Sequence, residues 1–166
     1  MDCVGQGEGL SERLAADREA QFPDLAKAGY RVTSQSARNY NCVAYAAGDE
    51  TRKWDSGGLL LPGYYWPPGA MRGHQIEALQ SAFATLGYEP CDTGDPEEGY
   101  EKVALYADEN GHWQHVARQL PGGHWASKLG DCEDILHTTV HALCSPVYGT
   151  VWGYMKRPTG AGSDRP

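Results

Sequence analysis

The feature that most constrains the fold is a series of three apolar segments, joined by two turn signals, between residues 102 and 129. The first two segments, 102–107 and 113–120, are separated by Asn110-Gly111, the strongest short-range signal for a β-hairpin. Pro121-Gly122-Gly123 then turns the chain into a third segment, 124–129. We therefore expect an antiparallel meander of three strands.

Helices are expected on both sides of this meander. Apolar residues recur at helical spacing over residues 75–86, which predicts a helix there. A weaker pattern over residues 11–28 is interrupted by Pro23, so a helix should end about two residues before this proline. Similar spacing predicts a helix over 131–143, and residues 148–155 resemble a last strand. Together these elements predict an α+β fold with helices packed against an antiparallel sheet.

The chain length and charge limit its organisation and its partners. The 166 residues suffice for one domain whose core needs no disulfide or metal. Glycine, proline and polar residues are frequent at both ends, so we expect residues 1–9 and 158–166 to be flexible and 10–157 to form the domain. The formal net charge of −8 argues against nucleic acid or a membrane as a partner, because either would need a basic surface.

The five cysteines, an odd number with no close pair, indicate reduced thiols rather than a disulfide framework. The first nine residues contain neither a basic nor an apolar segment, so we expect no cleavable signal peptide. No apolar run reaches transmembrane length. These observations favour a cytoplasmic protein, or one delivered without a cleavable signal peptide.

One cysteine stands where a thiol has a physical reason to be reactive. Cys42 begins a short apolar run that Gly48 closes, and Ser36, Asn39 and Asn41 can each cap a helix near that point. The unpaired N–H groups and the positive end of such a helix favour the thiolate, which is the nucleophilic form. The alternative is a structural cysteine, since free cysteines are among the most buried residues.

Among the six histidines, His115 is the best candidate for a general base, because it begins a strand whose position is fixed by a tight hairpin. If Gly122 lies at the centre of the second turn, His115 and Ser127 point to the same side of the sheet, one step apart diagonally. Ser127 would then accept the imidazole N–H, and Lys128 would point to the opposite side. The alternative orienting residues are Asp131 and Asp108.

The stretch from residue 51 to 73 is too rich in glycine and proline for a helix and too apolar for disorder. It contains three leucines at 59–61 and the aromatic residues Tyr65 and Trp66. Such a loop either forms a wall of a binding site or covers an edge of the core, and its closeness to Cys42 in the sequence favours the binding wall. The candidate substrate-binding residues are Tyr65, Trp66, Trp113, Asn39 and Asn41.

The order of these residues resembles that of the papain-like cysteine hydrolases, particularly the compact bacterial branch that includes the NlpC/P60 peptidases. Asn41-Cys42-Val43-Ala44-Tyr45-Ala46 is similar to their nucleophile helix. His115-Val116-Ala117 and Trp125-Ala126-Ser127-Lys128 are similar to their histidine strand and the strand that follows it. Residues 41–130 also resemble an uncharacterised family of short bacterial proteins.

The first resemblance implies both a fold and a mechanism. The Cys42 helix would pack against the antiparallel sheet, and Cys42 would attack an amide or ester carbonyl while His115 transfers the proton. The Cys42 N–H, with Asn39 or Asn41, would stabilise the oxyanion. The implied function is that of a peptidase, amidase, deamidase or acyltransferase acting on a peptide, a protein or a small amide, without a cofactor.

Two other functions are compatible with the sequence. A binding or adaptor domain would retain a papain-like shell without the chemistry and use its aromatic residues as a contact surface. A zinc-binding protein would draw its ligands from the predicted helix over 131–143, although one straight helix rarely supplies four converging ligands. Those ligands would be Cys132, His137, His141 and Cys144.

Overall fold

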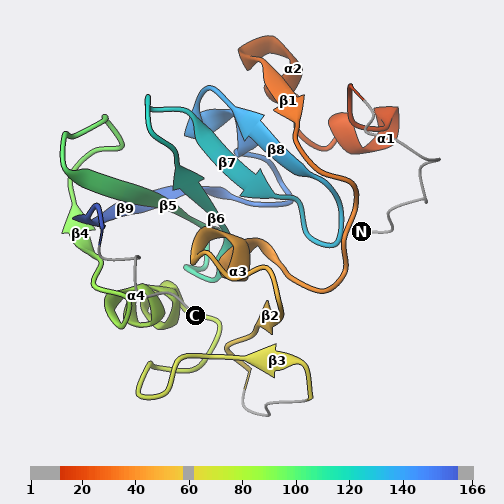
Figure 1. Ribbon diagram of the computed structural model, residues 1–166. Coiled ribbons are helices and arrows are strands. Elements are labelled where there is room, and N and C mark those ends of the chain that lie inside the picture. The colour runs from red at the N-terminus through yellow and green to blue at the C-terminus, as the bar shows by residue number, and fades with distance from the viewer. Residues whose placement is uncertain (1–11, 58–61, 161–166) are drawn as a thin grey trace.

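A seven-stranded sheet, antiparallel at every pairing, forms the centre of the computed structural model, which describes residues 12–57 and 62–160 (Figure 1). Its strand order is β1-β8-β7-β6-β5-β9-β4. The strands are β1 (Tyr30–Val32), β4 (Glu89–Cys91), β5 (Tyr100–Ala107), β6 (Trp113–Gln119), β7 (Trp125–Lys128), β8 (Asp134–His137) and β9 (Thr150–Pro158). A separate parallel pair is formed by β2 (Lys53–Trp54) and β3 (Tyr64–Tyr65). The predicted α+β class with an antiparallel sheet is confirmed.

The meander of β5, β6 and β7 is confirmed, and so is its register. Gly111 adopts a positive φ of 78° in the first turn, as an Asn-Gly hairpin requires. In the second hairpin Arg118 pairs with Ala126 and Gln119 with Trp125. Continued by one step, this register places Ala117 opposite Ser127, as the turn centred on Gly122 predicts.

Four α-helices and one 3₁₀ helix accompany the sheet in the described residues. They are α1 (Ala16–Glu19), α2 (Leu25–Ala28), α3 (Cys42–Ala46), α4 (Ile76–Ala84) and the 3₁₀ helix η1 (Val140–Leu143). The predicted helices at Cys42 and over 75–86 are confirmed as α3 and α4. The weak pattern before Pro23 produces only the single turn of α1, and a second turn, α2, follows that proline.

The helix predicted over 131–143 is wrong. This stretch contains β8 and η1, and β8 is an interior strand that pairs with β7 on one side and β1 on the other. Apolar residues of a strand and of a following 3₁₀ turn happen to recur at three- and four-residue spacing here. The pairing partners on both sides decide the outcome, because β-structure depends on neighbours that are distant in the sequence.

Alternate residues of the central strands build two separate cores, one on each face of the sheet. On β5, Val103 and Leu105 belong to the first core, which α3 and α4 cover. Ala104 and Tyr106 belong to the second core, which α2 and η1 cover. In Figure 1, α3 accordingly lies over β6 and β7, whereas α1 and α2 lie near β1.

The C-terminal strand extends slightly past the predicted end of the domain. Strand β9 continues to Pro158, which pairs with Tyr100, so the sheet runs one residue past the predicted boundary. The segments 1–9 and 161–166, predicted to be flexible, lie outside the described residues. Within 12–57 and 62–160, no helix has both the length and the apolar character needed to cross a membrane.

Gly149 precedes β9 at a position that excludes side chains. Its φ is 71°, and a Cβ added there would lie 2.1 Å from the carbonyl oxygen of Ala107. We expect Gly149→Ala to lower the free energy of unfolding by about 3 kcal/mol, from the left-handed backbone and the backbone clash combined. Gly153→Ala is the matched control, because a Cβ there meets nothing within 4 Å. Urea denaturation of both variants tests this, and equal stabilities would contradict it.

Candidate functional site

Cys42 is the first residue of α3, as predicted. Asn41 caps this helix: its Oδ1 accepts a hydrogen bond from the Ala44 N–H at 3.2 Å. The same oxygen accepts from the Trp54 N–H at 3.2 Å, and Nδ2 donates to the Trp54 carbonyl at 2.8 Å. The Asn41 amide therefore ties α3 to β2, and these three bonds engage one of the two asparagine side chains predicted to help the Cys42 N–H stabilise an oxyanion.

The Cys42 thiol is buried in the first core, where α3 packs against β6 and β7. The residue is 8% exposed, and burial raises the pKa of the thiol to about 11. Hydrogen bonding to the backbone of Val116 and the positive charge of Lys128 act in the opposite direction without cancelling the burial effect. At neutral pH the thiol is therefore protonated in this arrangement.

His115 faces the second core. It pairs with Tyr106 across β5 and β6, and the two rings meet edge to face with centroids 5.2 Å apart. On its other side the imidazole stacks on Tyr148, with centroids 4.2 Å apart and planes 9° apart. The side chain is completely buried, and burial lowers its pKa well below the usual value, with a smaller effect from His137. The imidazole is therefore neutral at physiological pH.

A chain of hydrogen bonds runs through buried side chains on three neighbouring strands. His115 Nε2 lies 3.0 Å from Ser127 Oγ, and the same oxygen lies 2.8 Å from His137 Nε2. His137 Nδ1 lies 2.8 Å from the carbonyl oxygen of Thr139. The predicted contact of His115 with Ser127 is present. The sequence did not reveal the role of His137, because the helix predicted over 131–143 concealed its strand.

Cys42 and His115 are not joined in this structure. Cys42 belongs to the first core with Val116, whereas His115, the neighbour of Val116 on β6, faces the second core. Among the described residues no hydrogen bond connects the two side chains, and the buried Nδ1 of His115 has no hydrogen-bond partner.

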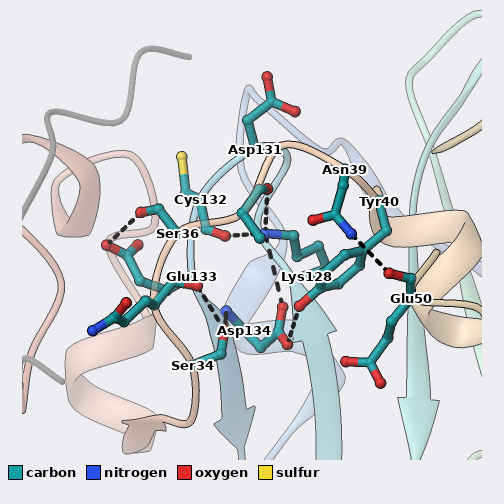
Figure 2. A network of polar contacts seen from close by, with 12 residues as sticks. Ser34, Ser36, Asn39, Tyr40, Glu50, Lys128, Asp131, Cys132, Glu133 and Asp134 are labelled. Carbon is teal, nitrogen blue, oxygen red and sulfur yellow. Dashed lines mark hydrogen bonds and ion pairs between the residues drawn. The ribbon is translucent and has the colours of Figure 1, made fainter. Parts of the chain in front are cut away.

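Lys128 lies on the α3 side of the sheet, as the register predicts, and is completely buried. Figure 2 shows its ammonium group within a network of polar contacts. Its Nζ donates to the carbonyl of Ala37 at 2.8 Å and to the carbonyl of Cys132, and lies 3.9 Å from Asp134 Oδ1. The Tyr40 hydroxyl donates to Asp134 Oδ2 at 2.7 Å. Because Tyr40 precedes Cys42 by two residues, this network fixes the segment that leads into α3.

The other proposed partners of His115 are engaged elsewhere. Asp131 forms an ion pair with Lys53 at 2.9 Å. Asp108 accepts the backbone N–H groups of Asn110 and His112 within its own hairpin, each at 2.9 Å. Neither carboxylate therefore orients His115.

The zinc alternative loses its structural basis. His137 lies on β8 and His141 in η1, not on one helix, and His137 uses both ring nitrogens in the hydrogen-bonded chain. Cys132 is disulfide-bonded, so the expectation of five reduced thiols is wrong for this residue. The other cysteines in the described part of the chain are free. There, no three potential ligands converge on one point.

The aromatic candidates divide into packing residues and one half-exposed residue. Trp66 is buried and stacks on Trp113, with the ring centroids 6.4 Å apart. Its indole N–H donates a hydrogen bond to the Met71 carbonyl. Trp113 donates to Ser56 Oγ at 3.1 Å. Both tryptophans therefore cover the edge of the first core, which is the alternative that the sequence left open.

Tyr65 and Asn39 remain partly accessible. The guanidinium carbon of Arg52 lies 3.7 Å from the ring centroid of Tyr65. Tyr65 also lines a hollow of about 310 Å³ beside the C-terminal end of α3. Asn39 is exposed and donates to the Glu50 carbonyl at 2.9 Å. The leucines at 59–61 lie outside the described residues.

The chain belongs to the family described as a domain of unknown function (DUF7689), whose model matches residues 31–156. The matched region contains α3, the hydrogen-bonded histidines and the Lys128 network. No curated protein and no solved structure matches the chain.

Removal of the Lys128 ammonium should weaken the fold strongly. Lys128→Met would leave two carbonyls without their buried donor and Asp134 without its ion-pair partner, so we expect the free energy of unfolding to fall by about 3 kcal/mol. The matched control is Lys53→Met, which removes a partly exposed ion pair with Asp131 and should cost less than about 1 kcal/mol. Chemical denaturation measures both values. A smaller loss for Lys128→Met than for the control would contradict the assigned role.

Acid should destabilise the protein through His137. Burial lowers the pKa of His137 from 6.5 to about 4, so the unfolded chain binds a proton between these values while the folded chain does not. The stability that this difference contributes amounts to about 3 kcal/mol. It is fully present above pH 6.5 and is lost as the pH falls toward 4. In His137→Gln the decrease in unfolding free energy between pH 7 and pH 4 should be shallower. An unchanged pH dependence would refute this assignment.

Proposed function

We propose that the chain is a cysteine hydrolase or acyltransferase that acts on an amide or ester bond. Cys42 is the nucleophile, His115 is the general base, and Ser127 orients the imidazole. The proposed substrates are peptides, proteins or small amides. The similarity of α3, β6 and β7 to the corresponding segments of the papain-like and NlpC/P60 enzymes supports this assignment. It remains a resemblance of sequence and element order.

The observation that carries the proposal is the unpartnered Nδ1 of His115. One nitrogen of this buried ring is held by Ser127, whereas the other has no hydrogen-bond partner. A buried polar atom without a partner costs about 1–3 kcal/mol, so its presence needs an explanation. A ring held at one nitrogen and open at the other is the arrangement that a general base requires.

The two pKa shifts determine the form in which the proposed pair would rest. The thiol pKa is raised to about 11 and the imidazole pKa is lowered, so thiol and neutral imidazole are favoured over an ion pair. His115 Nδ1 would take the proton as the sulfur attacks the carbonyl carbon. It would return that proton to the leaving group when the tetrahedral intermediate collapses. Water or another acceptor would then release the acyl group from Cys42. Because Cys42 and His115 face opposite sides of the sheet in this structure, a rearrangement that brings the two side chains together must precede the first step.

A binding domain without catalysis is the second candidate, and one observation favours it. Cys42 is almost fully buried and has no hydrogen bond to His115 in the structure. The net charge of −8 still argues against nucleic acid and membranes as partners of either function. Action in the cytoplasm remains a prediction, and the disulfide at Cys132 counts against it.

Acylation by p-nitrophenyl acetate tests the enzyme proposal without knowledge of the substrate. We expect acetylation of Cys42, read by peptide mass spectrometry, and a rate at least 100-fold lower in His115→Ala, because general-base catalysis contributes factors of about 10² or more. Ser127→Ala, which leaves the imidazole in place, should reduce the rate less. Cys144→Ser is the control, since this free thiol lies outside the site.

Thermal unfolding of each variant verifies that it is folded. The enzyme proposal fails if Cys42 is acetylated no faster than Cys144. It also fails if Cys42 is acetylated as fast in the folded His115→Ala and Ser127→Ala variants as in the unmodified chain. Either result favours the binding domain.

A further inference from the structure

We infer that His137 is a positioning residue that determines, through Ser127, which nitrogen of His115 carries the proton. The three side chains lie on adjacent strands β6, β7 and β8, in the interior of the sheet. The importance of this effect for catalysis rests on the proposed function. The placement of the proton itself follows from the hydrogen bonds together with the neutral state of the buried His137 ring.

The backbone carbonyl of Thr139 determines which atoms donate and which accept along this series of hydrogen bonds. A carbonyl oxygen can only accept a hydrogen bond, so His137 Nδ1, at 2.8 Å from it, must carry a proton. The buried imidazole is neutral near pH 7, since burial lowers its pKa to about 4. A neutral ring carries one proton, and His137 Nε2 is therefore an acceptor.

The direction is transmitted through a single hydroxyl. Ser127 Oγ lies 2.8 Å from His137 Nε2, and because that nitrogen is an acceptor, the serine must donate its only hydrogen to it. Towards His115 the same oxygen can then only accept. His115 Nε2, at 3.0 Å, must be the donor in that contact.

The consequence is a defined lone pair on the open side of His115. With the proton on Nε2, the unpartnered Nδ1 is the basic nitrogen. The opposite tautomer would bury an unpaired N–H donor at Nδ1 and would leave no base there. Stacking on Tyr148 holds the plane of the ring, so the nitrogens keep these positions.

Nitrogen NMR of the full chain labelled at histidine ring nitrogens tests the inference directly. We expect His115 to show a protonated Nε2 and an unprotonated Nδ1 at pH 7. In His137→Phe the ring volume is kept but the acceptor is lost, so Ser127 is free to donate to His115 and the Nδ1–H tautomer should gain population. His137→Gln places an amide oxygen near the lost nitrogen and should retain the original tautomer.

Two further variants keep the test decisive. Ser127→Ala removes the link and should shift the tautomer even if His137→Phe does not fold. Thr139→Ala is the control, because its exposed side chain is changed while the carbonyl stays, and it should leave the His115 signals unaltered.

A dominant Nδ1–H form in the unmodified chain, or signals unaffected by Ser127→Ala, would overturn the inference. The spectra do not depend on the thiol, and Cys42→Ser should reproduce those of the unmodified chain. A failed acylation experiment would thus refute the hydrolase without affecting the proton placement.

Discussion

The register between β6 and β7 is the constraint on which the rest of the site depends. With Arg118 opposite Ala126, alternate residues of both strands are directed to opposite faces of one sheet. His115 and Ser127 thereby enter the second core, and Lys128 enters the first core beside α3. A shift by one residue would exchange every one of these positions. The turn at residues 121–123 fixes this register and so determines which polar groups meet.

Each face of the sheet contains polar groups that must be paired within the protein. On one face the histidines satisfy one another through a serine and a backbone carbonyl. On the other face Lys128 satisfies carbonyls from two loops, and Asp134 receives the Tyr40 hydroxyl. Such networks cost desolvation and specify a single arrangement of their members. The open Nδ1 of His115 is one of several buried polar atoms without a hydrogen-bond partner in the described residues, among them Tyr148 Oη and Asp134 Oδ1. It carries the functional argument because it belongs to a ring whose other nitrogen is held by Ser127.

The parts of this architecture that local signals govern could be predicted from the sequence. Turn residues gave the meander and its register, and hence the contact of His115 with Ser127, while capping residues and apolar spacing gave α3 and α4. Strand β8 was missed because its identity depends on β1 and β7 rather than on its own spacing. The Lys128 network was missed because it joins residues more than ninety positions apart. No pattern within a short stretch of sequence indicates contacts between residues so far apart in the chain.

Asn41 gives the loop after α3 a mechanical connection to the thiol. Its amide is hydrogen-bonded to both the N–H and the carbonyl of Trp54. One residue earlier, the Tyr40 hydroxyl donates a hydrogen bond to Asp134. The start of α3 is thus hydrogen-bonded to the β2–β3 pair through Asn41 and to the main sheet through Tyr40. Any displacement of Cys42 must stretch one of these two connections. The β2–β3 pair is short, so a force applied to it reaches the start of α3 through the Asn41 amide and through the packing of Trp54 in the first core.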